Sequence, residues 1–269
     1  YLRKLQNLFK KINKKNQKMK KFNLNNIKIV SDPFPVMIYD NFISDEENDK
    51  IYEGIIRFNK FDTEKWGGRK QIRKETDNFN NLLKENQTIQ NVYNFFDDKE
   101  MFEYFYKKFE EISIKSTHNY KADYKNILFK KDYSKNYLKS FFNKFLLGKT
   151  ISYLEMDFSQ ADKGYFREPH HDKNTRLINF LIYFNDLNES DGGALDIYGY
   201  KSLPDVLKAQ PDEKLLDKKL KFIPQKKQLI IFLSNPVSIH GVSKIVSEKK
   251  RIFAYGSYTL ENKVIWKLN

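Results

Sequence analysis

Residues 168–198 read EPHHDKNTRLINFLIYFNDLNESDGGALDIY and hold the strongest structural signal in the chain. Apolar runs at 176–184 and 194–199 are separated by Asn, Asp and Gly, the pattern of two short strands joined by a turn. Similar runs occur on both sides, at 150–158, 228–233, 238–246 and 251–259. Short strands divided by turn residues are typical of an antiparallel sandwich or barrel.

The N-terminal half has a different pattern. A strand is predicted at 36–39, followed by a helix over 45–58, because Ser44 can cap this helix and Glu47 can complete a capping box. From about 80 to 145 the pattern is mainly helical, with aromatic residues three to four positions apart. We therefore predict an α+β fold, a double-stranded β-helix (jelly roll) with an N-terminal helical layer. The predicted domain spans 28–269, with helical support at 44–148 and the jelly-roll core at 150–260.

The positive charge is concentrated at the start of the chain. The net charge is +14, and ten Lys and Arg residues precede the first acidic residue, Asp32, so the remainder carries only 14 − 10 = +4. Leu2, Leu5, Phe9 and Ile12 recur at helical spacing, so part of the basic segment 1–27 could form an amphipathic helix that contacts an anionic surface or a partner. The alternative is a solvated leader or linker.

The composition excludes several classes of site. The chain has no cysteine, which rules out disulfides, zinc fingers, cysteine nucleophiles and iron–sulfur clusters. No apolar run is long enough to span a membrane and no signal peptide is visible, so we predict a cytoplasmic protein. The sequence begins with Tyr1 rather than Met, and an upstream segment could be missing.

Three of the four histidines fall in two short motifs. Side chains two apart on a strand share a face, so His170 and Asp172 can bind one ion while His171 points away. A further imidazole comes from His240, shortly after the apolar run 229–233. Two imidazoles and one carboxylate are the ligands of the facial triad of non-haem Fe(II) oxygenases.

The order of these motifs resembles the 2-oxoglutarate-dependent Fe(II) dioxygenases, and in particular their prolyl-4-hydroxylase-like branch. The resemblance covers roughly 30–260 and is strongest at 164–198 and 228–258. It implies a hydroxylase that uses Fe(II), 2-oxoglutarate and O2, with ascorbate as an optional addition. His170, Asp172 and His240 would then be the catalytic iron ligands.

The resemblance also implies a binding site for the co-substrate. Arg251 matches the position that binds the distal carboxylate of 2-oxoglutarate, for which a guanidinium offers a bidentate fork. Tyr183 matches a tyrosine that hydrogen-bonds the same carboxylate. Phe158 stands where some relatives have a tyrosine that helps to hold the co-substrate, so that contact is expected to be lost or replaced. Asn179 stands where Thr is frequent and is a candidate for the pocket lining.

The substrate is not determined by the sequence. An amino acid, a prolyl-type peptide or another small molecule would suit the scaffold, and the loops at 66–70 and 200–218 are candidates for its binding. A non-catalytic jelly-roll binding module is the first alternative function. Oxidative nucleic-acid demethylation is the second, but relatives of that kind carry another Arg where this chain has Ser257, so specific nucleic-acid binding is not expected.

Overall fold

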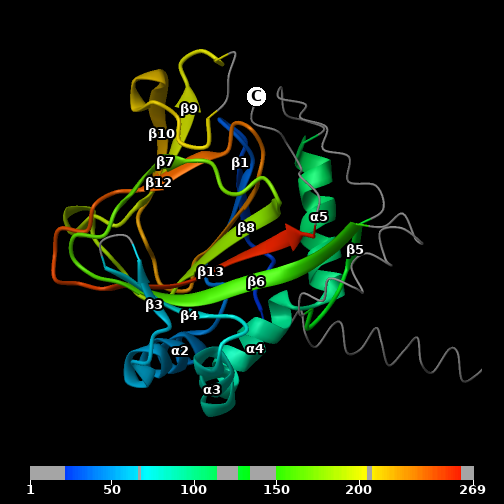
Figure 1. Cartoon of the computed structure of the whole chain (residues 1–269), viewed down its shortest axis with the longest axis vertical. Coiled ribbons are helices and arrows are strands. Elements are labelled where there is room, and N and C mark those ends of the chain that lie inside the picture. Colours follow the sequence, from blue (N-terminus) through cyan, green and yellow to red (C-terminus); the bar gives the residue numbers. More distant parts are fainter. Residues whose placement is uncertain (1–21, 66–67, 114–126, 134–149, 205–207, 262–269) are drawn as a thin grey trace, which may run out of the picture.

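Two β-sheets face each other in the computed structural model, which describes residues 22–65, 68–113, 127–133, 150–204 and 208–261. The larger sheet has nine strands in the order β1-β2-β11-β8-β13-β6-β4-β3, and β5 pairs in parallel with β6 (Figure 1). Its strands are β1 (Ile27–Val30), β2 (Val36–Tyr39), β3 (Thr63–Lys65), β4 (Arg69–Arg73), β5 (Ile127–Phe129), β6 (Thr150–Ala161), β8 (Arg176–Tyr183), β11 (Leu229–Leu233) and β13 (Arg251–Leu260).

The smaller sheet has four antiparallel strands in the order β10-β9-β12-β7. They are β7 (Arg167–His170), β9 (Leu195–Tyr200), β10 (Leu216–Phe222) and β12 (Ile239–Val242). Strands that are distant in sequence therefore pair, as in a jelly roll. The predicted double-stranded β-helix is confirmed.

The central strands of the larger sheet are buried on both faces. On β11, Leu229, Ile231 and Leu233 pack into the core on the helical side. Ile230 and Phe232 pack into a second core between the two sheets. Because each face of this strand meets an apolar layer, its sequence is continuously apolar rather than alternating.

Four helices cover the outer face of the larger sheet (Figure 1). They are α2 (Asp45–Phe58), α3 (Asp77–Glu85), α4 (Gln87–Phe96) and α5 (Lys99–Ser113). The prediction for α2 is confirmed in detail: Ser44 accepts a hydrogen bond from the Glu47 amide at 3.2 Å, and the Glu47 carboxylate accepts from the Ser44 amide. Further along α2, the side chains of Ile51 and Ile55 are buried in the core.

Two parts of the fold differ from the sequence prediction. The helical region at 80–145 is interrupted by β5, whose Phe129 packs against Phe102 of α5; residues 114–126 and 134–149 lie outside the described residues. The insertion at 200–218, expected to be a loop, contains a short 3₁₀ turn (Glu213–Leu215) in its described part, and its last residues begin strand β10 of the smaller sheet.

The basic segment 1–27 is described only from residue 22 onward, so its predicted amphipathic helix lies outside the described residues. Phe22 and Leu24 are buried in the core on the helical side, and the Phe22 ring stacks on Phe42 with 5.1 Å between centroids. Residues 22 and 24 therefore pack with the domain that the sequence predicts from position 28 onward. No helix in the described ranges is long and apolar enough to cross a membrane.

Gly256 in β13 allows the close approach of a neighbouring ring. A Cβ at this position would lie 2.1 Å from Phe180 of β8, and the Phe180 ring stacks on Phe96 of α4 at 4.0 Å. We expect Gly256→Ala to lower the free energy of unfolding by about 1–3 kcal/mol, because the added methyl group overpacks the core. Chemical denaturation measures this, and Phe180→Leu in the same background should recover part of the loss.

Candidate functional site

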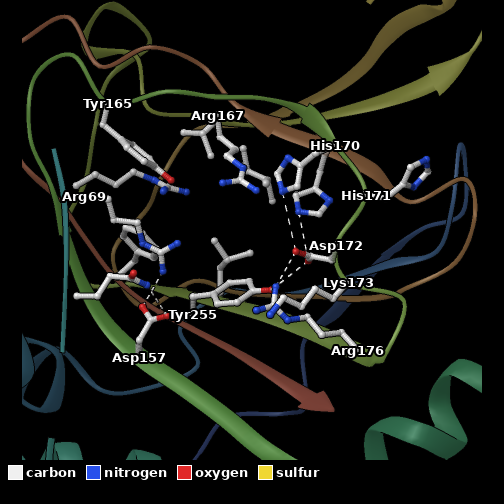
Figure 2. A pocket seen from close by; sticks show the side chains of 17 residues that line it. Arg69, Asp157, Tyr165, Arg167, His170, His171, Asp172, Lys173, Arg176 and Tyr255 are labelled. Atoms are coloured by element: carbon white, nitrogen blue, oxygen red, sulfur yellow. Dashed lines mark hydrogen bonds and ion pairs between the residues drawn. The ribbon is translucent and has the colours of Figure 1, made fainter. Parts of the chain in front are cut away.

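A cavity of about 260 Å³ opens between the two sheets and holds most of the predicted site residues. Its walls come from β4, β6, β8 and β13 of the larger sheet and from β7, β9 and β12 of the smaller one. Figure 2 shows His170 and Asp172 at one end of this cavity and Arg69 and Asp157 at the other.

Strand pairing brings the three candidate metal ligands together. His170, the last residue of β7, lies directly opposite His240 of β12, and their ring centroids are 4.5 Å apart. Asp172 follows two residues later, after the strand has ended. One ligand atom from each of the three residues lies within 4.8 Å of the others. The predicted set therefore converges, although Asp172 lies in the segment after the strand rather than in the strand itself.

Backbone hydrogen bonds fix the tautomers of both histidines. His170 Nδ1 lies 2.8 Å from the Glu168 carbonyl, and His240 Nδ1 lies 3.2 Å from the Ser238 carbonyl. Because a carbonyl oxygen can only accept, each Nδ1 must donate, so in the neutral ring the lone pair is on Nε2. These Nε2 atoms lie 4.0 Å and 3.5 Å from the two Asp172 oxygens. This donor set fits a divalent cation.

The protonation states suit metal binding as well. Burial, together with the nearby His240, lowers the pKa of His170 to about 3. Burial also lowers the pKa of His240. At Asp172 burial favours the neutral acid, but the Arg176 guanidinium and the two histidines outweigh it and hold the pKa below its usual range. At neutral pH the site therefore offers two neutral imidazoles and one carboxylate, the forms that bind a metal.

His171 lies apart from this group, as the alternation of side chains predicts. Its Nε2 is 3.3 Å from the hydroxyl of Tyr200 on β9, and Figure 2 shows its ring directed away from Asp172. Burial lowers its pKa to about 4.

The Asp172 carboxylate is held by two residues that the sequence analysis did not identify. Arg176 Nη1 donates to Asp172 Oδ1 at 2.8 Å, and the Tyr255 hydroxyl lies 3.0 Å from Oδ2. Arg176 also donates to the Tyr255 hydroxyl at 2.8 Å, which closes the three groups into a ring of contacts. Asn179 lies behind Tyr255, with its Oδ1 3.2 Å from the hydroxyl, and it does not line the cavity.

We expect Tyr255→Phe to weaken Fe(II) or Mn(II) binding by roughly 10- to 100-fold, the usual effect of removing a hydrogen bond to a ligating side chain. Tyr258→Phe is the matched control. Tyr258 is also on β13 and also buried, but its hydroxyl donates to the Phe96 carbonyl on the helical side. Metal titration of both variants is the measurement, and equal affinities would contradict a role for Tyr255.

Arg251 lies deep in the same cavity and is only 1% exposed. Its Nη2 donates to the Tyr183 hydroxyl at 3.1 Å, and its guanidinium lies over the Phe253 ring at 4.3 Å. No carboxylate among the described residues forms an ion pair with it, and its buried Nε has no hydrogen-bond partner there. A buried guanidinium with unused donors fits an anionic carboxylate.

Phe158 does not line the cavity, because its side chain is on the other face of β6. It packs in the core on the helical side, against Phe79 and Phe184. Its neighbour Asp157 is the residue of β6 that lines the cavity. The tyrosines that line the cavity are Tyr165 and Tyr255.

Arg69, which belongs to the predicted loop 66–70, forms the wall opposite the histidines. Its Nη2 donates to Asp157 Oδ1 at 2.7 Å and its Nε to the Ser159 hydroxyl at 3.1 Å. Gln71 donates to the other Asp157 oxygen at 3.1 Å. Residues 66–67 of that loop lie outside the described residues. From the 200–218 insertion, Ala209 and Gln210 line a second cavity beside the first.

Comparisons with known structures give matches of low sequence identity. A viral collagen prolyl hydroxylase from Paramecium bursaria Chlorella virus-1 is 15% identical, with 85% of this chain and 97% of that chain covered and a TM-score of 0.44. A prolyl hydroxylase from Trichoplax adhaerens, solved with a hypoxia-inducible-factor peptide fragment, is 13% identical, with 94% and 92% covered and a TM-score of 0.47. No curated protein matches the chain.

A family model matches a part of the chain whose strands line the cavity. It covers residues 156–258, which include His170, Asp172, His240 and Arg251, and its description is the 2OG-Fe(II) oxygenase superfamily. Residues 156–258 are therefore similar to the 2OG-Fe(II) oxygenase superfamily, and this region of similarity contains all three candidate metal ligands.

Proposed function

We propose that the protein is an Fe(II)- and 2-oxoglutarate-dependent oxygenase that hydroxylates a C–H bond of a small molecule or a peptide. The observation that carries this proposal is the convergence of three groups on one point. Two Nε2 lone pairs and the Asp172 carboxylate face each other, while a buried guanidinium lies in the same cavity.

In this proposal His170, Asp172 and His240 hold Fe(II) and leave one face of the ion open. Arg251 and Tyr183 bind the distal carboxylate of 2-oxoglutarate. The bound iron and co-substrate supply O2 activation for attack on a C–H bond, while the protein provides placement and excludes water. Leu181, Leu195, Val242 and Phe253 are the apolar part of the cavity lining and would keep it dry.

Arg176 and Tyr255 would act through Asp172. With one donor on each carboxylate oxygen, they hold the orientation of the carboxylate and keep it ionised. Both are positioning residues in this proposal, because neither would touch the iron or the co-substrate.

The proposal is tested with the purified chain and no assumption about the substrate. Anaerobic addition of Fe(II) and 2-oxoglutarate should produce the visible charge-transfer absorption of their complex, and O2 should then release succinate. Absorption without succinate release, over a panel of amino acids and peptides, would favour the non-catalytic binding module. Absence of both would contradict the proposal.

The demethylase alternative gains no support, since Ser257 is buried and its hydroxyl pairs with that of Thr259.

Two finer predictions accompany this function. The cytoplasmic location and the contact of segment 1–27 with an anionic surface or partner rest on the sequence alone.

Deleting residues 1–21 should leave Fe(II) and 2-oxoglutarate binding unchanged, because all the residues proposed for the site lie after position 68.

A further inference from the structure

The cavity lining carries a surplus of positive charge. Five cationic side chains and two carboxylates line it: Arg69, Arg167, Lys173, Arg176 and Arg251 against Asp157 and Asp172. An Fe(II) ion and a 2-oxoglutarate dianion would add charges of +2 and −2 and leave this surplus unchanged. A positive field in a partly dry cavity attracts anions and disfavours cations.

Three of the five cations have a role in the site already described. Arg69 is paired with Asp157 at 2.7 Å and Arg176 with Asp172 at 2.8 Å. Arg251 is proposed to bind the co-substrate. Lys173 is exposed at the rim. The fifth cation is Arg167, which lines this cavity and also the second cavity beside it.

Arg167 lines the cavity together with the candidate metal ligands. It is on β7, three residues before His170, and it lies opposite Val242 of β12. Figure 2 shows the side chains of Arg167 and Arg69 extending into the cavity from opposite walls. Burial lowers the pKa of Arg167; Tyr165 and Asp172 oppose this effect, and the positive charge of Arg69 adds to it. A guanidinium nevertheless stays protonated at neutral pH, so the charge persists.

The two cavities meet at this residue. The inner cavity of about 260 Å³ is small for a co-substrate and a complete second molecule, since ligand pockets usually measure about 300–1,000 Å³. A second cavity of about 450 Å³ shares Arg167, His170 and His171 with it. The ring of Phe166, 47% exposed, forms an apolar part of that outer cavity.

We propose that the hydroxylated substrate is an anion, whose carboxylate or phosphate group binds Arg167 between the two cavities while the rest of the molecule occupies the outer one. This inference rests on the proposed function. It narrows the substrate class from any amino acid, peptide or small molecule to one with a negatively charged group close to the reacting carbon.

Matched pairs of compounds test the substrate class. Amino acids and short peptides are offered as free acids and as carboxamides, and serine-containing peptides with and without a phosphate, and succinate release is measured. We expect kcat/KM to be roughly 10- to 100-fold higher for the charged member, the range for a hydrogen bond to a charged group. Arg167→Gln should remove this preference while the KM for 2-oxoglutarate stays unchanged. Arg167→Lys should retain part of it.

A binding measurement covers the case in which no compound of the panel is turned over. The Mn(II)-loaded, 2-oxoglutarate-saturated protein is titrated with inorganic phosphate or with ¹³C-acetate, and nuclear relaxation of the anion by Mn(II) is recorded. We expect saturable relaxation that is lost in Arg167→Gln and kept in Lys163→Gln, which removes an exposed charge paired with Glu248. The anion whose relaxation saturates at the lower concentration identifies the charged group of the substrate as phosphate or carboxylate.

The two proposals fail in different ways. A wild-type protein that binds neither Mn(II) nor 2-oxoglutarate contradicts the proposed function. A protein that binds both, but relaxes the anions equally with and without Arg167 or uses amides as well as acids, overturns the anionic substrate alone.

Discussion

Asp172→Ala should abolish the binding of one Fe(II) or Mn(II) per chain at concentrations that saturate the wild-type protein. The variant loses one of three ligands, so the loss should exceed the roughly 10- to 100-fold that is typical when only a hydrogen bond to a ligand is removed. His170→Ala should give the same result, because its Nε2 faces the same point. Isothermal titration with Mn(II) measures both.

His171→Ala is the control for this prediction, since it removes an imidazole from the neighbouring position. Its ring contacts Tyr200 rather than Asp172, so metal affinity should stay near the wild-type value. Thermal unfolding of the apo forms shows whether each variant is folded. A reversed order, with His171→Ala abolishing binding and His170→Ala retaining it, would show that the assignment is wrong by one residue.

The second large effect is expected at Arg251. Removing one side of a buried charge pair costs about 3–5 kcal/mol. At about 1.4 kcal/mol per tenfold change, Arg251→Ala should weaken 2-oxoglutarate binding by roughly two to three orders of magnitude. Fe(II) affinity should hardly change, because Arg251 contacts Tyr183 and Phe253 and no candidate metal ligand. Titration of the metal-loaded protein with 2-oxoglutarate is the measurement.

Two further variants separate charge from geometry at this position. The affinity of Arg251→Lys for 2-oxoglutarate should fall between those of the wild type and the alanine variant, because an ammonium keeps the attraction but loses the bidentate fork. Tyr183→Phe removes one hydroxyl and should cost only about 0.5–1.5 kcal/mol, or up to roughly tenfold in affinity. Wild-type half-saturation by 2-oxoglutarate in Arg251→Ala would show that another cation of the cavity binds the co-substrate.

Local patterns in the sequence were enough to predict several elements of the fold. Helix α2 follows from its capping box, and β11 follows from an apolar run that is buried on both faces. The spacing of His170 and Asp172 likewise places two candidate ligands near each other, because residues two apart stay close in any extended segment.

Other features depend on a single residue of register, which the sequence pattern did not resolve. Successive side chains on a strand point to opposite faces, so Asp157 lines the cavity while Phe158 lies in the core on the helical side. Strand β10 was missed because its charged residues, among them Lys218 and Lys221, do not follow an apolar pattern; both form ion pairs in the structure.

By itself the sequence determined the two-layer α+β pattern, the candidate ligands and the candidate co-substrate arginine, because each depends on short-range periodicity or on an ordered motif. Only the tertiary structure decided what surrounds them. Arg69, Arg167, Arg176 and Tyr255 come from four different strands, and no spacing in the chain relates them. They meet because pairing of β7 with β12, and of β13 with β6 and β8, closes a cavity between two sheets, and this closure fixes the charge that a substrate encounters.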